Sequence, residues 1–169
     1  RTVGAQIRDG ARRRLTDAEV GERLREVGLD DPAVARKYPF QLSGGLRQRA
    51  GLAAALAGDP DVLLADEPST ALDVTTQAKV LRLLGRLRAE RGLALVIITH
   101  DLGVAFSVSD RTLILYGGSL LESGPSGTLA HASRHPYTRR LIECEPTIEL
   151  RIKNLSGIPG AVPRADDVV

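Results

Sequence analysis

The chain has few of the residues that usually form a large aromatic core, a disulfide framework or a membrane span. It has no methionine, no tryptophan, two phenylalanines and three tyrosines among 169 residues. Its core must therefore be built from leucine, valine, isoleucine and alanine. The single cysteine, Cys144, cannot form an internal disulfide or bind zinc alone, which favours a reducing compartment. No apolar run approaches the roughly 20 residues that cross a bilayer.

An excess of charge of one sign is also missing. The 23 basic and 21 acidic side chains leave a formal charge of +2, which argues against a general electrostatic grip on nucleic acid. Hydrophobic residues make up 43% and charged residues 26% of the chain, which excludes wholesale disorder. The length suits one domain or part of a larger one. Residues 1–4 resemble neither a signal peptide nor an initiator methionine, so we expect an internal piece of a longer protein.

The N-terminal region has a charged, helical pattern. Thr16 and Glu19 have the spacing of a capping box, which predicts a helix that runs to Gly28. The Asp-Asp-Pro turn at residues 30–32 predicts a short helix that ends before Tyr38.

After residue 43 the pattern alternates between helix and strand. We expect helices over residues 44–57 and 74–91, and strands over residues 62–65 and 93–99. The long helix has one apolar stripe, formed by Val80, Leu83, Leu84 and Leu87. Two almost wholly apolar strands joined by a helix predict an α/β fold with a parallel sheet that is covered on both faces. A hairpin around residues 117–118 and two short helices are expected to follow.

Ser43, Gly44 and Gly45 stand at the start of the first of these helices. The first N–H groups of a helix have no partner within it, and glycine has no Cβ to block an approaching anion. The helix dipole also favours a phosphate at this end. A plain helix cap explains the same three residues, and this motif alone favours that interpretation.

Two adjacent carboxylates, Asp66 and Glu67, follow the first predicted strand. Their burial at this point costs free energy unless a positive group or water compensates. Mg²⁺ bound to nucleotide phosphates suits Asp66. Glu67 is expected to point elsewhere, where it can polarise a water for attack on a terminal phosphate. A solvated acidic turn explains this segment about equally well.

His100 follows the second predicted strand. Because parallel strands end at the same edge of a sheet, we expect His100 on the edge that carries Asp66 and Glu67. There its ring can hydrogen-bond a terminal phosphate or the attacking water. Taken alone, a histidine after a strand is more often a structural residue.

In this order, the motifs resemble those of the nucleotide-binding subunit of ATP-binding-cassette (ABC) transporters. The matching segments are residues 42–45 (signature motif), residues 62–67 (Walker B strand), residues 69–73 (D-loop) and His100 (switch histidine). Leu46 stands where the signature motif commonly has glutamine. Oligopeptide and dipeptide importers often have methionine there, and leucine is similar to methionine in size.

The resemblance to oligopeptide and dipeptide importers extends toward both ends of the chain. Residues 135–141 resemble the His-Pro-Tyr-Thr stretch of these importers. Residues 158–163 resemble the next characteristic segment of these importers, called here the landmark. Residues 2–7 resemble the start of their helical subdomain. A helix start after Pro136 is a sufficient local explanation of the first of these segments.

This resemblance implies a partial P-loop NTPase (ABC ATPase) fold, with a parallel sheet flanked by helices, an N-terminal helical subdomain and a C-terminal hairpin and helical tail. It implies three regions: residues 1–57 form the helical subdomain that ends in the signature helix, residues 58–123 form the C-terminal half of the ATPase core, and residues 124–169 form a peptide-importer extension.

The resemblance also implies ligands and roles. The intact protein is expected to bind ATP and Mg²⁺ and to power an importer of peptides or similar small solutes. The implied roles are phosphate binding in trans by Ser43, Gly44 and Gly45, Mg²⁺ support by Asp66, hydrolysis by Glu67, phosphate sensing by His100 and linkage of the two sites by Asp73.

The implied partners are a second ATPase subunit in a head-to-tail dimer, membrane permease subunits and, indirectly, a solute-binding protein. Nucleic acid is not among them. The implied location is peripheral, on the cytoplasmic face of the cell membrane. The helical region before Tyr38 is expected to face the permease, although its charged helices also fit a simple solvated surface.

The phosphate-binding motif Gly-x-x-x-x-Gly-Lys-Ser/Thr does not occur in the chain, nor does the glutamine loop of the family. We therefore expect the 169 residues alone to lack ATPase activity. Without the first strands of such a sheet, apolar surface is expected to be exposed. Two other functions stay open: an ABC ATPase that works without a permease, and a catalytically silent protein that binds a partner ATPase.

Overall fold

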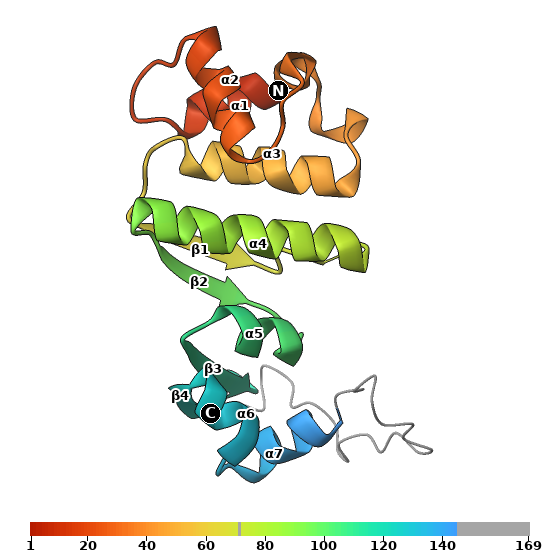
Figure 1. Cartoon of the computed structure of the whole chain (residues 1–169), viewed down its shortest axis with the longest axis vertical. Coiled ribbons are helices and arrows are strands. Elements are labelled where there is room, and N and C mark those ends of the chain that lie inside the picture. The colour runs from red at the N-terminus through yellow and green to blue at the C-terminus, as the bar shows by residue number, and fades with distance from the viewer. Residues whose placement is uncertain (71, 145–169) are drawn as a thin grey trace. The chain divides into compact units, whose positions relative to one another are not determined.

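The computed structural model describes residues 1–70 and 72–144 (Figure 1). The chain forms two compact units, of which the first comprises Arg1–Ile98 and the second begins at Thr99. None of the helices in the described ranges combines the length and the hydropathy that a membrane span requires.

The first unit begins with a group of helices around one core. They are α1 (Val3–Gly10), α2 (Asp17–Glu26), the 3₁₀ helices Pro32–Arg36 and Pro39–Gln41, and α3 (Gly44–Leu56). The helices α1 and α2 pack against α3 (Figure 1). Their facing side chains are almost fully buried, among them Ile7, Leu24 and Leu56.

The predicted capping box is present at the start of α2. The Thr16 hydroxyl accepts a hydrogen bond from the Glu19 N–H at 3.3 Å, and the Glu19 carboxylate accepts one from the Thr16 N–H at 2.8 Å. A hydrogen bond from Arg13, followed by the Thr16 N–H, lowers the pKa of Glu19 to about 2. The helix ends at Glu26, two residues before the predicted end at Gly28.

A strand–helix–strand unit follows: β1 (Val62–Asp66), α4 (Val74–Arg91) and β2 (Ala94–Ile98). The two strands pair in parallel, as predicted, with Asp66 opposite Ile98. Asp73 caps the start of α4, and Gly92 ends it in the left-handed conformation with φ of 64°. The predicted apolar stripe of α4 is buried and belongs to the same core as Leu63 and Leu95 of the strands.

The other face of this two-stranded sheet is exposed. Its apolar side chains are Val62 (53% exposed), Leu64 (70%), Val96 (47%) and Ile98 (56%). The prediction of a sheet covered on both faces is therefore wrong for the described residues. The strands contain enough apolar residues for two covered faces, but the described helices cover one. The expectation of exposed apolar sheet surface is confirmed.

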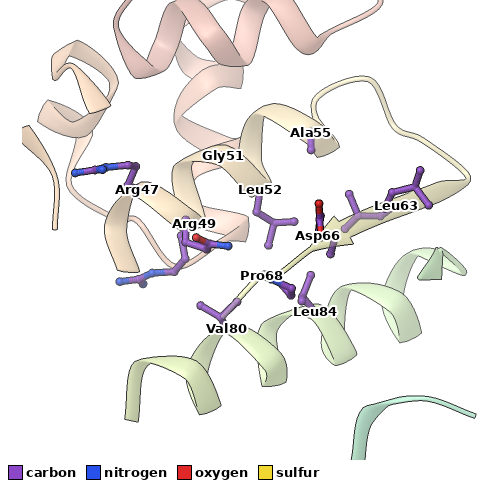
Figure 2. Close-up of a pocket in the computed structure, with 13 residues that line it drawn as sticks. Arg47, Arg49, Gly51, Leu52, Ala55, Leu63, Asp66, Pro68, Val80 and Leu84 are labelled. Atoms are coloured by element: carbon purple, nitrogen blue, oxygen red, sulfur yellow. The ribbon is translucent and has the colours of Figure 1, made fainter. Parts of the chain in front are cut away.

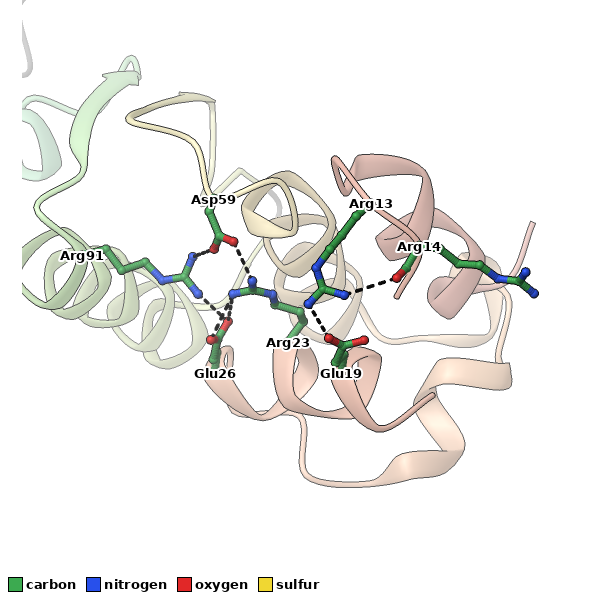
Figure 3. A network of polar contacts seen from close by, with 7 residues as sticks. All are labelled: Arg13, Arg14, Glu19, Arg23, Glu26, Asp59 and Arg91. Atoms are coloured by element: carbon green, nitrogen blue, oxygen red, sulfur yellow. Dashed lines mark hydrogen bonds and ion pairs between the residues drawn. The ribbon is translucent and has the colours of Figure 1, made fainter. Parts of the chain in front are cut away.

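A closed ring of charges joins α2, the turn before β1 and the end of α4 (Figure 3). Arg23 lies 3.3 Å from Glu26 and 2.9 Å from Asp59. Arg91 lies 2.6 Å from Glu26 and 3.3 Å from Asp59. Each arginine therefore contacts both carboxylates, an arrangement that stabilises more than isolated surface pairs do.

The second unit contains α5 (Leu102–Val108), the antiparallel pair β3 (Arg111–Tyr116) and β4 (Ser119–Pro125), α6 (Ser126–Ala132) and α7 (Pro136–Glu143). The hairpin and both short helices were predicted. β4 ends at Pro125, directly before α6.

The start of α7 is held on the hairpin by Glu122. Its carboxylate accepts hydrogen bonds from the N–H groups of Arg134 at 2.7 Å and His135 at 3.2 Å. The Arg134 N–H is the main cause of the lowered pKa of Glu122. The tyrosine rings of Tyr116 and Tyr137 also pack together, with centroids 4.6 Å apart. The landmark at residues 158–163 lies outside the described residues.

Candidate functional site

The turn before α3 has an open, uncapped helix start. Ser43 occupies the N-cap position with an extended backbone, as predicted, but its side chain makes no capping hydrogen bond. Ser43 and Gly44 are both exposed. Ser43 is therefore at the predicted N-cap position, but the prediction that its side chain caps the helix is wrong. The first N–H groups of α3 are left available to an external acceptor, which suits an anion.

Two arginines, to which the sequence interpretation assigned no role, hold this turn by hydrogen bonds to backbone carbonyls. Arg47 donates through Nε to the Pro39 carbonyl at 3.1 Å. Arg49 donates to the carbonyls of Gly45 at 3.3 Å and Gly28 at 2.9 Å. Their roles depend on contacts with the loop before the helix, which no spacing within the motif reveals.

Thr76 brings the turn before α3 next to the start of α4. A Cβ atom on Gly45 would lie 2.4 Å from Cγ2 of Thr76, so only glycine fits there without a shift. The Thr76 hydroxyl donates to Oδ2 of Asp73 at 2.6 Å, and its N–H donates to Oδ1 at 3.0 Å. These two bonds lower the pKa of Asp73. Gly45 and Asp73, two predicted site residues, thus lie on either side of one threonine.

The carboxyl end of β1 carries the acidic pair. Asp66 ends the strand and is exposed, whereas Glu67 is half-buried. Glu67 adopts a left-handed backbone with φ of 46°, a conformation that non-glycine residues rarely adopt and that is often found at functional sites. Its N–H donates to the carbonyl of Ile98 at 2.9 Å, which ties the turn to β2.

Asp66 and α3 line one cavity of about 310 Å³ between α3, β1 and α4 (Figure 2). Its walls include Arg49 and Leu52 from α3, Leu63 from β1 and Leu84 from α4. The structure therefore brings α3, which begins at Gly44, to the same cavity as Asp66, the first carboxylate of the acidic pair.

The end of β1 offers one carboxylate, from Asp66, as a possible metal ligand. Within residues 1–70 and 72–144, no three His, Cys, Asp or Glu side chains gather as a protein-built metal site would need. One carboxylate, from Asp66, fits Mg²⁺ that is held mainly by nucleotide phosphates and water.

His100 belongs to the second unit and is exposed. Asp101, the next residue, caps α5 by accepting from the Val104 N–H at 2.9 Å. The parallel pairing of Asp66 with Ile98 confirms that both strands end at the same edge. The expectation that His100 lies beside Glu67 stays a prediction.

Two family models match the chain. One is described as ABC transporter and matches residues 4–70. The other is described as oligopeptide/dipeptide transporter, C-terminal region, and matches residues 121–168.

Curated relatives agree with these two models. The chain is 40% identical to the oligopeptide transport ATP-binding protein OppD of Lactococcus lactis subsp. cremoris, over 90% of this chain and 45% of the relative. It is 40% identical to the dipeptide transport ATP-binding protein DppD of Escherichia coli, over 96% of this chain and 52% of the relative. The chain thus spans about half the length of the curated relatives that it matches.

Solved structures agree in fold. A dimeric, post-hydrolysis state of the ATP-binding cassette MJ0796, bound to ADP and Pi, matches with a TM-score of 0.62 and 32% identity, over 74% of this chain and 56% of that one. Another dimeric structure of MJ0796, titled a bacterial ABC transporter cassette, matches with a TM-score of 0.62 and 34% identity, over 73% and 54%.

Proposed function

We propose that this chain, which matches the ABC transporter model over residues 4–70 and the oligopeptide/dipeptide transporter C-terminal model over residues 121–168, forms part of an ATP-hydrolysing subunit. The whole subunit is this chain together with a segment that supplies the phosphate-binding loop. It powers the import of peptides or similar small solutes. The match of residues 121–168 favours this function over an ABC ATPase that works without a permease.

The observation that carries this proposal is the backbone geometry at the end of β1. Asp66 and Glu67 are consecutive, yet the left-handed backbone of Glu67 changes the direction of the chain between them. We infer a separate task for each of the two carboxylates. Asp66 supports Mg²⁺, which, when bound with ATP, neutralises phosphate charge and orients the phosphates. Glu67 accepts a proton from the attacking water.

The uncapped start of α3 supports phosphate binding by Ser43, Gly44 and Gly45. Their exposed position and the orphan N–H groups suit a terminal phosphate that a partner subunit holds. A likeness to dimeric cassettes supports a dimer. We propose that this dimer is head-to-tail and that each nucleotide lies between its two subunits.

The remaining roles follow from this dimer. Asp73, which Thr76 fixes close to Gly45, links the two nucleotide sites. His100 hydrogen-bonds the terminal phosphate. The permease binds the helical region before Tyr38, at the cytoplasmic face of the membrane, and a solute-binding protein delivers the solute to the permease. The 169 residues alone do not hydrolyse ATP, because the loop that cradles the β- and γ-phosphates is missing from them.

The substitution Glu67→Gln in the whole subunit tests this proposal. We expect ATP turnover to fall by about 100-fold or more, because a general base contributes a factor of that order, while ATP still binds and a closed dimer accumulates. Hydrolysis is measured by phosphate release, and the dimer by size-exclusion chromatography. Glu90→Gln, at an exposed glutamate of α4, is the matched control. Rapid hydrolysis in Glu67→Gln would show that Glu67 is not the base.

A further inference from the structure

Thr70 makes a contact with the proposed general base that the motif interpretation did not assign. Its hydroxyl donates a hydrogen bond to Oε2 of Glu67 at 2.6 Å. A carboxylate oxygen accepts such a bond best when it is ionised, and a general base must be ionised before it takes a proton. The contact therefore favours a fixed orientation of the Glu67 carboxylate.

The backbone of Glu67 is already fixed without this hydroxyl. The Glu67 N–H donates to the Ile98 carbonyl at 2.9 Å, and the Glu67 carbonyl accepts from the Thr70 N–H at 3.2 Å. Pro68 lies between them and is buried. The turn is thus closed by main-chain bonds and by the fixed φ of proline. What these bonds leave undetermined is the direction of the Glu67 side chain, which has several rotatable bonds.

Threonine suits the task of holding that side chain. Its β-branched side chain has few allowed χ1 rotamers, so a hydroxyl on it has a well-defined direction. Thr70 itself is exposed, so packing in a core does not account for a threonine at this position. The hydroxyl contributes a bond to Glu67 and little to the closure of the turn.

We propose that Thr70 is a positioning residue for ATP hydrolysis, which holds the Glu67 carboxylate in the direction needed to take a proton from the attacking water. This inference rests on the proposed function, in which Glu67 is the general base. It adds a residue that acts through Glu67 and does not itself touch ATP.

The test compares Thr70→Val, which removes the hydroxyl at nearly constant size, with Thr70→Ser, which keeps it, in the whole subunit. We expect Thr70→Val to lower kcat about 10- to 100-fold, because small misplacements of a reacting group cost that much, with KM for ATP within about twofold. We expect Thr70→Ser to keep kcat within about threefold. Thr128→Val, at an exposed threonine of α6, is the matched control, and Thr70→Ala is the second hydroxyl-free variant if Thr70→Val does not fold.

A double-mutant cycle separates positioning from a general structural effect. In the Glu67→Gln background we expect Thr70→Val to cause no further loss of turnover, since the group that it positions is gone. Normal turnover in Thr70→Val beside an inactive Glu67→Gln would overturn this inference alone. A further loss in the double variant, or a loss in Thr70→Ser equal to that in Thr70→Val, would also overturn it. Normal turnover in Glu67→Gln would overturn the proposed role of Glu67 and this inference with it.

Discussion

The helical region and the two-stranded sheet of the first unit bury their apolar side chains to very different degrees. The facing residues of α1, α2 and α3 are almost fully buried, with Leu24 1% and Leu56 0% exposed. The outer face of the sheet leaves Leu64 70% and Ile98 56% exposed. Apolar side chains line both of these faces, so the difference lies in what covers them. The helical region belongs to a closed core that it shares with α4 and the inner face of the strands, whereas no described residues cover the outer face of the sheet.

The largest expected difference is between two leucines, one from each region. Leu24→Ala should lower the free energy of unfolding of the chain by about 2–5 kcal/mol, because it leaves a cavity in a closed core. Leu64→Ala should change it by less than about 0.5 kcal/mol, because the side chain is mostly exposed, and should slow aggregation. Chemical denaturation and light scattering measure the two effects. A larger loss for Leu64→Ala than for Leu24→Ala would reverse the comparison.

The contact between Gly45 and Thr76, where α3 meets the start of α4, should give the next largest effect. Gly45→Ala places a Cβ atom 2.4 Å from Cγ2 of Thr76, and we expect a loss of about 1–3 kcal/mol from this overpacking. Thr76→Ser removes Cγ2 and keeps the hydroxyl that binds Asp73. The double variant should therefore recover most of the lost stability in chemical denaturation. If the double variant is no more stable than Gly45→Ala alone, contact with Thr76 is not the reason that position 45 requires glycine.

The ring of charges that joins α2 to the end of α4 should contribute least. Arg91→Ala should lower the free energy of unfolding by about 1 kcal/mol, and the loss should shrink at about 1 M salt, where charges are screened. Arg82→Ala, on the exposed surface of the same helix, is the control and should have no salt-dependent effect. A loss for Arg91→Ala that is equal at low and high salt would indicate packing and not charge.

The features predicted correctly from the sequence are those that local chemistry determines. Thr16 with Glu19 specified a capping box, and Asp73 with Gly92 bounded α4, because each signal involves residues a few positions apart. The resemblance to ABC transporters of the oligopeptide and dipeptide type was confirmed by the two family models.

The features that were missed depend on residues far apart or on what covers a surface. Arg91 meets Glu26 across 65 positions of the sequence, and no periodicity signals such a pair. The apolar strands predicted two covered faces because strand composition reflects the surroundings of a whole sheet, of which the described helices supply one side. Thr70 was missed for another reason: a hydroxyl three residues after an acid is common in turns, and only the 2.6 Å contact distinguishes it.

Steady-state phosphate release, measured on the purified 169-residue chain and on the whole subunit, tests the central claim most directly. The claim is that this chain supplies the general base and the signature turn of an ATPase, but not the loop that cradles the phosphates. We predict turnover by the whole subunit and none by the chain alone. Turnover by the chain alone that Glu67→Gln abolishes would contradict the claim.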